Sequence, residues 1–261
     1  MDAFLYTLPA WLLFLLIVGG SVGLAWVGIV LLHHRTAAPM DEKHNEVAGF
    51  IFATVGVLYA VLLAFTVIIV WEQYLAAESA VSQEAAALIT VARDTSSFPE
   101  PARGQVHDQL HAYAQFVIND EWRTMDEGTL EHEESKGALA AINTVWSIYR
   151  SLPPGQVDSH TTDSLDNLSA QRAIRLQSNV AALPAVLWFG LLLGAVVTIC
   201  FCLVLHMKNV QLHAALTALL TGLVATSIWM IVIINHPFAG DLHVSTDAFR
   251  HAIYVIDSLP R

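Results

Sequence analysis

The stretch VAGFIFATVGVLYAVLLAFTVIIVW, residues 47–71, decides the fold of this chain, because it contains no Asp, Glu, Lys or Arg. Three further stretches share this property: 10–32, 184–205 and 212–234. Each is about as long as the ~20 helical residues that cross a hydrocarbon core of ~30 Å. Helices of soluble proteins are rarely apolar on all sides. The sequence therefore predicts an all-α, four-pass helical membrane protein.

The linkers between the spans give the domain organisation. Linkers 33–46 and 206–211 are short, so spans one and two form one hairpin and spans three and four form another. A polar stretch separates the two hairpins. We therefore predict a first transmembrane hairpin (1–71), an acidic extramembrane helical domain (72–183), a second transmembrane hairpin (184–235) and a polar C-terminal tail (236–261).

The second span is expected to continue as a helix beyond the membrane. Residues after Trp71 are rich in Ala, Glu and Gln and contain no Gly or Pro before Pro99, so their helix propensity is high. Tyr74, Val81 and Leu88 recur every seven residues and predict a seam that meets another helix. Three further amphipathic patterns follow, marked by Val106, Leu110, Tyr113 and Val117, by Leu139, Ile142, Trp146 and Tyr149, and by Leu165, Leu168, Leu176, Val180 and Leu183.

The charge of the chain limits its partners. The net charge is −11, and residues 72–183 hold sixteen Asp or Glu against seven Lys or Arg. This balance argues against nucleic acid and anionic lipid as partners of that region and favours cations or basic partners. The N-terminus has no positive region before its apolar run, so we expect the first span to remain in the mature protein. The expected location is the cell membrane, of the bacterial inner-membrane type, with the lipid bilayer as a partner.

The spans also indicate a mechanism. Proton-coupled transporters usually keep an ionisable residue at membrane depth, and no such residue lies in mid-span here. A channel with a narrow apolar constriction needs no buried charge, because such a pore gates by dewetting. Four spans enclose little room, so a pore would need a homo-oligomer of about three to five chains. Small residues fall on one face of span two, namely Gly49, Ala53, Gly56, Ala60 and Ala64. This face either packs inside the four-helix unit or lines a pore between subunits.

Two segments carry a resemblance to a known family. The first is the approach to span two, HNEVAGFIF (44–52), with the polar continuation after Trp71. The second is NHPFAG (235–240), followed by Val244-Ser245 and Ala248-Phe249. These motifs resemble the bestrophin-like family over nearly the whole chain. The resemblance implies an oligomeric membrane protein that acts as an ion channel, and the family name points loosely to anions.

The resemblance and the span pattern together select candidate pore residues. A bestrophin neck is ringed by apolar side chains, and by character Phe52, Val55, Tyr59 and Leu63 match that role. The predicted pore-lining set is Gly49, Phe52, Ala53, Gly56, Tyr59, Ala60 and Leu63. The predicted pore mouth is Asn45, Glu46 and Glu72. The conducted species would be small inorganic ions. The spans contain no Lys or Arg to form an anion-selecting ring, so we expect a weak preference for cations.

Three other groups of residues could have a chemical role. His107 and His111 echo a zinc-protease motif, but Asp108 stands where that motif needs Glu, so a solvated helix face is favoured. The acid-rich run 120–134 is interpreted as a solvated loop, with a weak cation site as the alternative. Five histidines at the short-linker face are candidates for pH sensing, namely His33, His34, His44, His206 and His213.

Two functions from different classes remain open on the sequence. The first is an oligomeric ion channel whose pore is lined by the second span. The alternative is a non-conducting membrane scaffold or sensor whose extramembrane helices bind a partner. Catalytic motifs, phosphate-binding loops and metal-ligand spacings are missing, so we expect no enzyme, no cofactor and no metal. The two cysteines, Cys200 and Cys202, lie in one span and form no disulfide framework.

Overall fold

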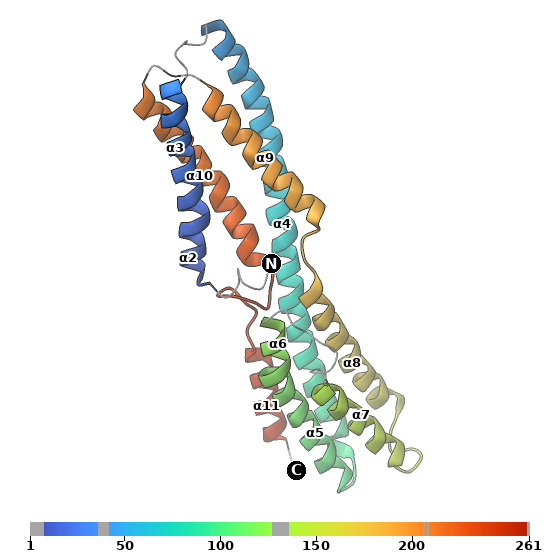
Figure 1. Cartoon of the computed structure of the whole chain (residues 1–261). Helices are drawn as coiled ribbons and strands as arrows, with labels where there is room; N and C mark the ends of the chain where they lie inside the picture. Colours follow the sequence, from blue (N-terminus) through green and yellow to red (C-terminus); the bar gives the residue numbers. More distant parts are fainter. Residues whose placement is uncertain (1–7, 36–41, 127–135, 206, 208, 260–261) are drawn as a thin grey trace. The chain divides into compact units, whose positions relative to one another are not determined.

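The computed structural model describes residues 8–35, 42–126, 136–205, 207 and 209–259. Within these residues the chain is helical and contains no strand, which confirms the all-α fold. Among the described residues, four helices are long and apolar enough to cross a membrane. The helices are α2 (Ala10–Phe14), α3 (Gly20–Arg35), α4 (Glu42–Asp94), α5 (Ala102–Phe116), α6 (Trp122–Asp126), α7 (Lys136–Ser151), α8 (Ser159–Val180), α9 (Ala185–Val204), α10 (Val210–Ile234) and α11 (Asp247–Ser258) (Figure 1).

The chain divides into two compact units. One comprises Met1–Glu72 and Ala182–Asn235, and is called the transmembrane unit here. The other comprises Gln73–Ala181 and His236–Arg261, and is called the polar unit. Helix α4 contributes to both, since its 53 residues run without interruption from Glu42 to Asp94, as the sequence predicts.

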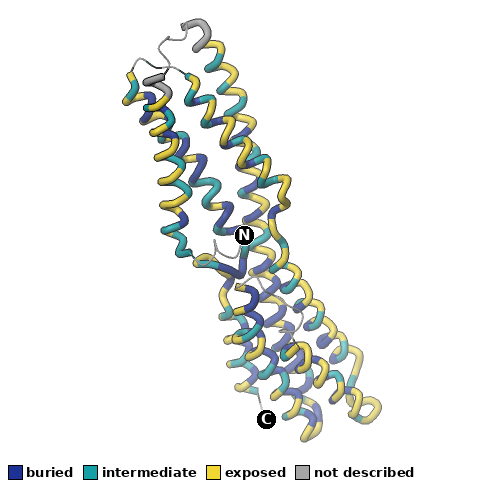
Figure 2. Tube along the Cα trace, in the orientation of Figure 1, coloured by how far each residue is buried: buried dark blue, intermediate teal, exposed yellow. Residues whose placement is uncertain are grey.

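The transmembrane unit contains both hairpins. Helix α10 packs along α3, and the Trp229 indole donates a hydrogen bond to the Ala10 carbonyl at 3.2 Å. The Asn235 side chain accepts a hydrogen bond from the Leu183 amide at 2.9 Å, which joins the end of α10 to the segment before α9. Many residues of its helices are exposed (Figure 2), among them large apolar ones such as Leu58 of α4, which is 68% exposed. Outward apolar side chains suit a helix bundle whose solvent is lipid.

The polar unit has its own hydrophobic core, formed by the second part of α4 with α5, α6, α7, α8 and α11. Val81 and Leu88 of the predicted seam are fully buried in this core, and Tyr74 packs against it. The seam therefore meets helices of the same chain. The other predicted stripes also face this core, with three exceptions: Leu139 and Val180 are exposed, and Leu183 is buried but belongs to the transmembrane unit.

The segment after α10 forms a tight turn. Gly240 has φ of 77°, which favours glycine, and the Val244 amide donates to the Pro237 carbonyl at 2.8 Å. The Gly240 amide donates to the Asp126 carboxylate at 3.2 Å. Phe238 is buried in the core of the polar unit. The motif at 235–240 therefore has a structural role, as its turn chemistry indicates.

Candidate functional site

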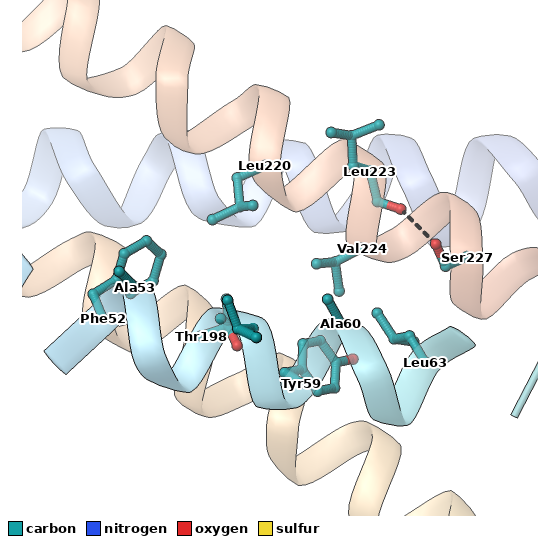
Figure 3. A pocket seen from close by; sticks show the side chains of 12 residues that line it. Phe52, Ala53, Tyr59, Ala60, Leu63, Thr198, Leu220, Leu223, Val224 and Ser227 are labelled. Atoms are coloured by element: carbon teal, nitrogen blue, oxygen red, sulfur yellow. Dashed lines mark hydrogen bonds between the residues drawn. The ribbon is translucent and has the colours of Figure 1, made fainter. Parts of the chain in front are cut away.

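Most of the predicted pore-lining residues border one cavity inside the transmembrane unit. The cavity measures about 400 Å³ and lies between α4, α9 and α10 (Figure 3). Its lining from α4 is Phe52, Ala53, Gly56, Val57, Tyr59, Ala60 and Leu63, and its lining from the other helices is Thr198, Leu220, Leu223, Val224 and Ser227. Gly49 belongs to the predicted set and does not border the cavity.

The lining residues of α4 differ in what they touch. Tyr59 and Leu63 are buried, at 6% and 8% exposure. The Tyr59 hydroxyl donates to the Leu191 carbonyl at 3.0 Å, and its ring lies over Gly194, where an added Cβ would come within 2.3 Å of the ring. Ala53 and Ala60 are exposed on the outside of the single chain. Helix α4 thus anchors itself through Tyr59 and leaves its small side chains accessible.

The predicted mouth residues are partly described. Glu46 and Glu72 are both exposed. Asn45 lies within α4, but its side chain is outside the described residues. The two acids therefore remain accessible to ions in the single chain.

Of the five histidine candidates, His213 is the one whose side chain lies among the described residues. His213 is buried, and its Nε2 lies 2.9 Å from the Cys202 carbonyl. His33, His34 and His44 lie in helices with their side chains outside the described residues, and His206 is also outside them. The pH-sensing role of this set stays a prediction.

A buried ionic cluster lies in the polar unit and was not predicted. Arg175 of α8 and Glu84 of α4 are both 0% exposed, with Arg175 Nε 2.7 Å from Glu84 Oε2. Arg175 also pairs with Glu121, and Arg172 pairs with Glu121 from the other side. The Tyr113 hydroxyl donates to Glu84. Two carboxylates thus face two guanidinium groups, which balances the charge in the core.

The ionisation of Glu121 follows from these neighbours. Burial opposes the charged form, but the Arg175 and Arg172 guanidinium groups outweigh it and keep the pKa of Glu121 below its usual value. Burial and the nearby Glu84 carboxylate raise the pKa of Tyr113 well above its usual value, so Tyr113 remains a donor.

The cluster corrects one prediction about the acid-rich run 120–134. Glu121 is 1% exposed and paired, so this part of the run is core and not a solvated loop. Residues 127–135 are outside the described residues. Glu121 is buried because it lies four residues after Val117 and so continues the same apolar helix face. Counting the charged residues along the run does not reveal this position.

Aromatic side chains connect the cluster to the C-terminal tail. The Arg175 guanidinium lies 5.8 Å from the ring centroids of both Trp122 and Phe249. Trp122 contacts Phe238 and Phe249 edge to face, at 5.5 and 6.0 Å, and its indole donates to the Val244 carbonyl at 3.3 Å. The tail is therefore bound to the same core that holds the ion pairs.

The zinc-like histidine pair does not lie on a fully solvated helix face, which corrects the interpretation favoured from the sequence. His107 is buried, and its Nε2 lies 3.0 Å from the Ala92 carbonyl. His111 Nε2 lies 4.0 Å from the Asp257 carboxylate. In the part of the chain that the structure describes, no three His, Cys, Asp or Glu side chains gather to hold a metal ion.

These features define a four-pass helical membrane protein with a helical polar unit inserted between its hairpins. The model of the Bestrophin-like domain matches residues 19–249, so the chain belongs to the bestrophin-like family. No curated protein matches the chain.

Solved structures show the same fold. Two variants of a bacterial bestrophin homologue from Klebsiella pneumoniae superpose with TM-scores of 0.68 and 0.66, at 14% and 12% identity. Both matches cover 94% of this chain, and they cover 98% and 99% of the homologue. A structure described as a membrane protein matches at a TM-score of 0.66 and 14% identity, covering 94% of this chain and 98% of that one. At such identities the likeness concerns the fold.

Proposed function

We propose that this chain is an oligomeric ion channel of the cell membrane, with a pore lined by α4 and a weak preference for cations. The observation that supports this most is the exposure of α4 in the single chain. Its spanning part is uncharged, yet much of its surface is exposed in the single chain. Family membership and the shared fold add support, since the bestrophin name implies ion conduction.

The exposure of α4 suggests how a pore wall would be built. Ala53 and Ala60 are exposed, and Gly49, Phe52 and Gly56 are half-buried, so these residues can face an axis shared with other chains. Tyr59 and Leu63 are buried against the chain's own helices and would support the wall from behind. An uncharged, apolar constriction gates by excluding water, which needs no ionisable group.

The expected cation preference rests on charge outside the spans. Residues 72–183 carry nine more acids than bases. The buried cluster contains two acids and two bases, so it does not account for this excess. A vestibule lined with one sign of charge concentrates counter-ions and repels co-ions. Glu72, exposed where the span ends, is the acid of this region nearest to the span.

The experiment is to measure mass in nanodiscs and reversal potentials across a salt gradient in planar bilayers. We expect three to five chains per particle and a reversal potential shifted towards the equilibrium potential of the cation. Glu72→Gln should move this potential towards zero, whereas Asp166→Asn, an exposed acid of α8, serves as the control. A strictly monomeric particle refutes the pore, and a chloride-selective wild type refutes the cation preference.

A non-conducting scaffold or sensor is the second candidate. Exposed apolar side chains on the polar unit favour it, notably Tyr254 of α11 at 72% and Ile174 of α8 at 46%. Isolated apolar side chains are common on protein surfaces, so this observation is the weaker one. An oligomer that carries no current in any tested salt would favour the scaffold.

A further inference from the structure

Among the described helices of the polar unit, α7 is the one whose charged residues are all bases. It contains Lys136 and Arg150 and no Asp or Glu, whereas the whole chain has a net charge of −11. Both bases are exposed. Arg150 forms no ion pair with any residue that the structure describes. Helix α7 therefore presents an unpaired positive charge on an acidic molecule.

The base Arg150 belongs to a stripe on the outer side of α7. The inner side, with Ala138, Ile142 and Val145, is buried in the core of the polar unit, where α7 packs on α5. On the outer side the exposed residues recur at spacings of three or four and so share one helix face. This basic stripe consists of Leu139, Asn143, Ser147 and Arg150, and Leu139 is 47% exposed.

Helix α8 carries the opposite charge on its outer side. Its two bases, Arg172 and Arg175, are buried in the ionic cluster, so its exposed charges are the acids Asp163 and Asp166. The inner side of α8 is fixed to α4 through Arg175 and Glu84. The acidic stripe on the outer side consists of Asp163, Asn167, Ala170 and Ile174, and Ile174 is 46% exposed.

The two stripes match when the helices that carry them run antiparallel. Leu139 and Arg150 are eleven residues apart, and so are Asp163 and Ile174. Eleven residues make three helical turns to within about 20° and rise by about 17 Å. An antiparallel pair of helices can therefore place Arg150 against Asp163 and Leu139 against Ile174 at the same time. Ala170 lies between these two contacts and allows close approach.

The match requires two copies of the chain. Both stripes are exposed in the single chain, so neither covers the other there. Two basic stripes would set Arg150 against a second base, and two acidic stripes would set acid against acid, so contacts between like stripes are disfavoured. A contact between unlike surfaces is heterologous, and it generates a ring when the rotation from chain to chain closes. The proposed pore needs a ring of this kind.

We propose that the basic stripe of α7 in one chain docks antiparallel on the acidic stripe of α8 in a second copy of this chain, and that the contact repeats around the ring. The inference rests on the proposed function, because the oligomeric channel provides the ring. Leu139 and Ile174 cover each other's exposed apolar surface. Arg150 and Asp163 fix direction and register, which is what charge complementarity contributes most at an interface.

Cross-linking between two different variants tests the contact. Leu139→Cys and Ile174→Cys are made in full-length protein with Cys200→Ala and Cys202→Ala, then co-expressed and reconstituted in nanodiscs. A short bismaleimide should join the two kinds of chain into a dimer on a denaturing gel. Neither variant alone should cross-link, because the contact joins unlike surfaces. Tyr254→Cys, exposed on α11, replaces Leu139→Cys in the control for chance collisions and should give no dimer.

Charge reversal tests the register. Arg150→Asp sets acid against acid and should raise the concentration at which the oligomer dissociates in detergent about two- to tenfold. Asp163→Arg should have the same effect, and the two together should restore the wild-type value. Arg250→Asp is the matched control, because Arg250 is an exposed base of α11 and should leave dissociation unchanged. All three positions are exposed, and near-ultraviolet circular dichroism verifies that each variant is folded.

The outcomes separate this contact from the proposed channel. A dimer from the mixed variants, together with rescue by the double reversal, supports the contact. An oligomer that gives no mixed dimer, or whose two reversals add instead of cancelling, overturns the contact and leaves the channel standing. Cross-linking of either single variant to itself shows a contact between like surfaces and also overturns the proposal. A strictly monomeric wild type refutes the contact and the channel together.

Discussion

Removing the buried guanidinium of Arg175 should destabilise the polar unit strongly. Arg175→Met keeps a long apolar side chain but leaves Glu84 buried without its cation, while Glu121 retains only Arg172. Breaking a buried pair in this way typically costs about 3–5 kcal/mol. For a chain of about this size, one kcal/mol shifts the melting temperature by about 2–4 °C. The variant should therefore melt about 6–20 °C below the wild type.

The pH dependence separates lost charge pairing from lost packing. In the wild type the folded pKa of Glu121 is lowered, so its stabilising effect is present above the unfolded pKa and is lost as pH falls through the folded value. In Arg175→Met, Glu121 loses one of the two guanidinium groups that lower its pKa, so less stabilisation is left for acid to remove. That variant therefore loses less stability than the wild type as pH falls. The difference in melting temperature should thus shrink as pH falls below about 5.

The assay is near-ultraviolet circular dichroism of the protein in detergent, recorded while heating at several pH values. Arg250→Met is the matched control, because Arg250 lies exposed on α11 of the same unit. An exposed substitution should change stability by less than about 0.5 kcal/mol. Equal melting of the two variants would show that the cluster contributes no net stability. A difference that does not vary with pH would assign the effect to packing around Trp122 and Phe249.

Three further predictions concern the transmembrane unit. Gly194→Ala places a methyl group against the Tyr59 ring and should lower the free energy of unfolding by about 1–3 kcal/mol. Gly49→Ala is the control, because its added methyl group meets open space and should not lower stability. Melting curves of the two variants test this difference. Asn235→Ala leaves the buried Leu183 amide without its acceptor and should cost about 1–3 kcal/mol, measurable as faster hydrogen exchange at that amide. Replacing the five candidate histidines of the short-linker face with Gln should flatten any change in ion flux between about pH 7.5 and 5.5, and an unchanged profile would remove their sensing role.

Much of the fold could be predicted from the sequence because its signals are local. The uncharged spans, the continuous helix propensity after Trp71 and the short linkers each depend on neighbouring residues alone. The bilayer adds a strict rule, since an apolar segment without water must satisfy its backbone internally and therefore forms a helix. The same reasoning located the small-residue face of α4.

The cluster could not be predicted with the same certainty, because pairing between helices is not local. A partial signal was present. Glu84 stands between Val81 and Leu88 on the buried side of α4, and Arg172 and Arg175 extend the stripe of Leu165 and Leu168. A charged residue on an apolar stripe predicts a buried charge that needs a partner. Which helix provides that partner depends on the tertiary arrangement.

The cavity illustrates a second limit. Helical spacing placed Phe52, Gly56 and Tyr59 on one face of α4, but spacing does not reveal what lies opposite. In the structure that face borders a cavity shared with α10, and Tyr59 reaches α9.

The residues that carry the family resemblance do not bear equally on function. Phe238, Val244 and Phe249 all contact Trp122, so the C-terminal part of the motif holds the tail against the core of the polar unit. Asn235 joins the end of α10 to the segment before α9. These contacts give the motif a part in packing the helices. The family therefore gives little guidance on selectivity, which should depend on the exposed acids near α4, so the reversal potential of the wild type and of Glu72→Gln is the measurement that decides it.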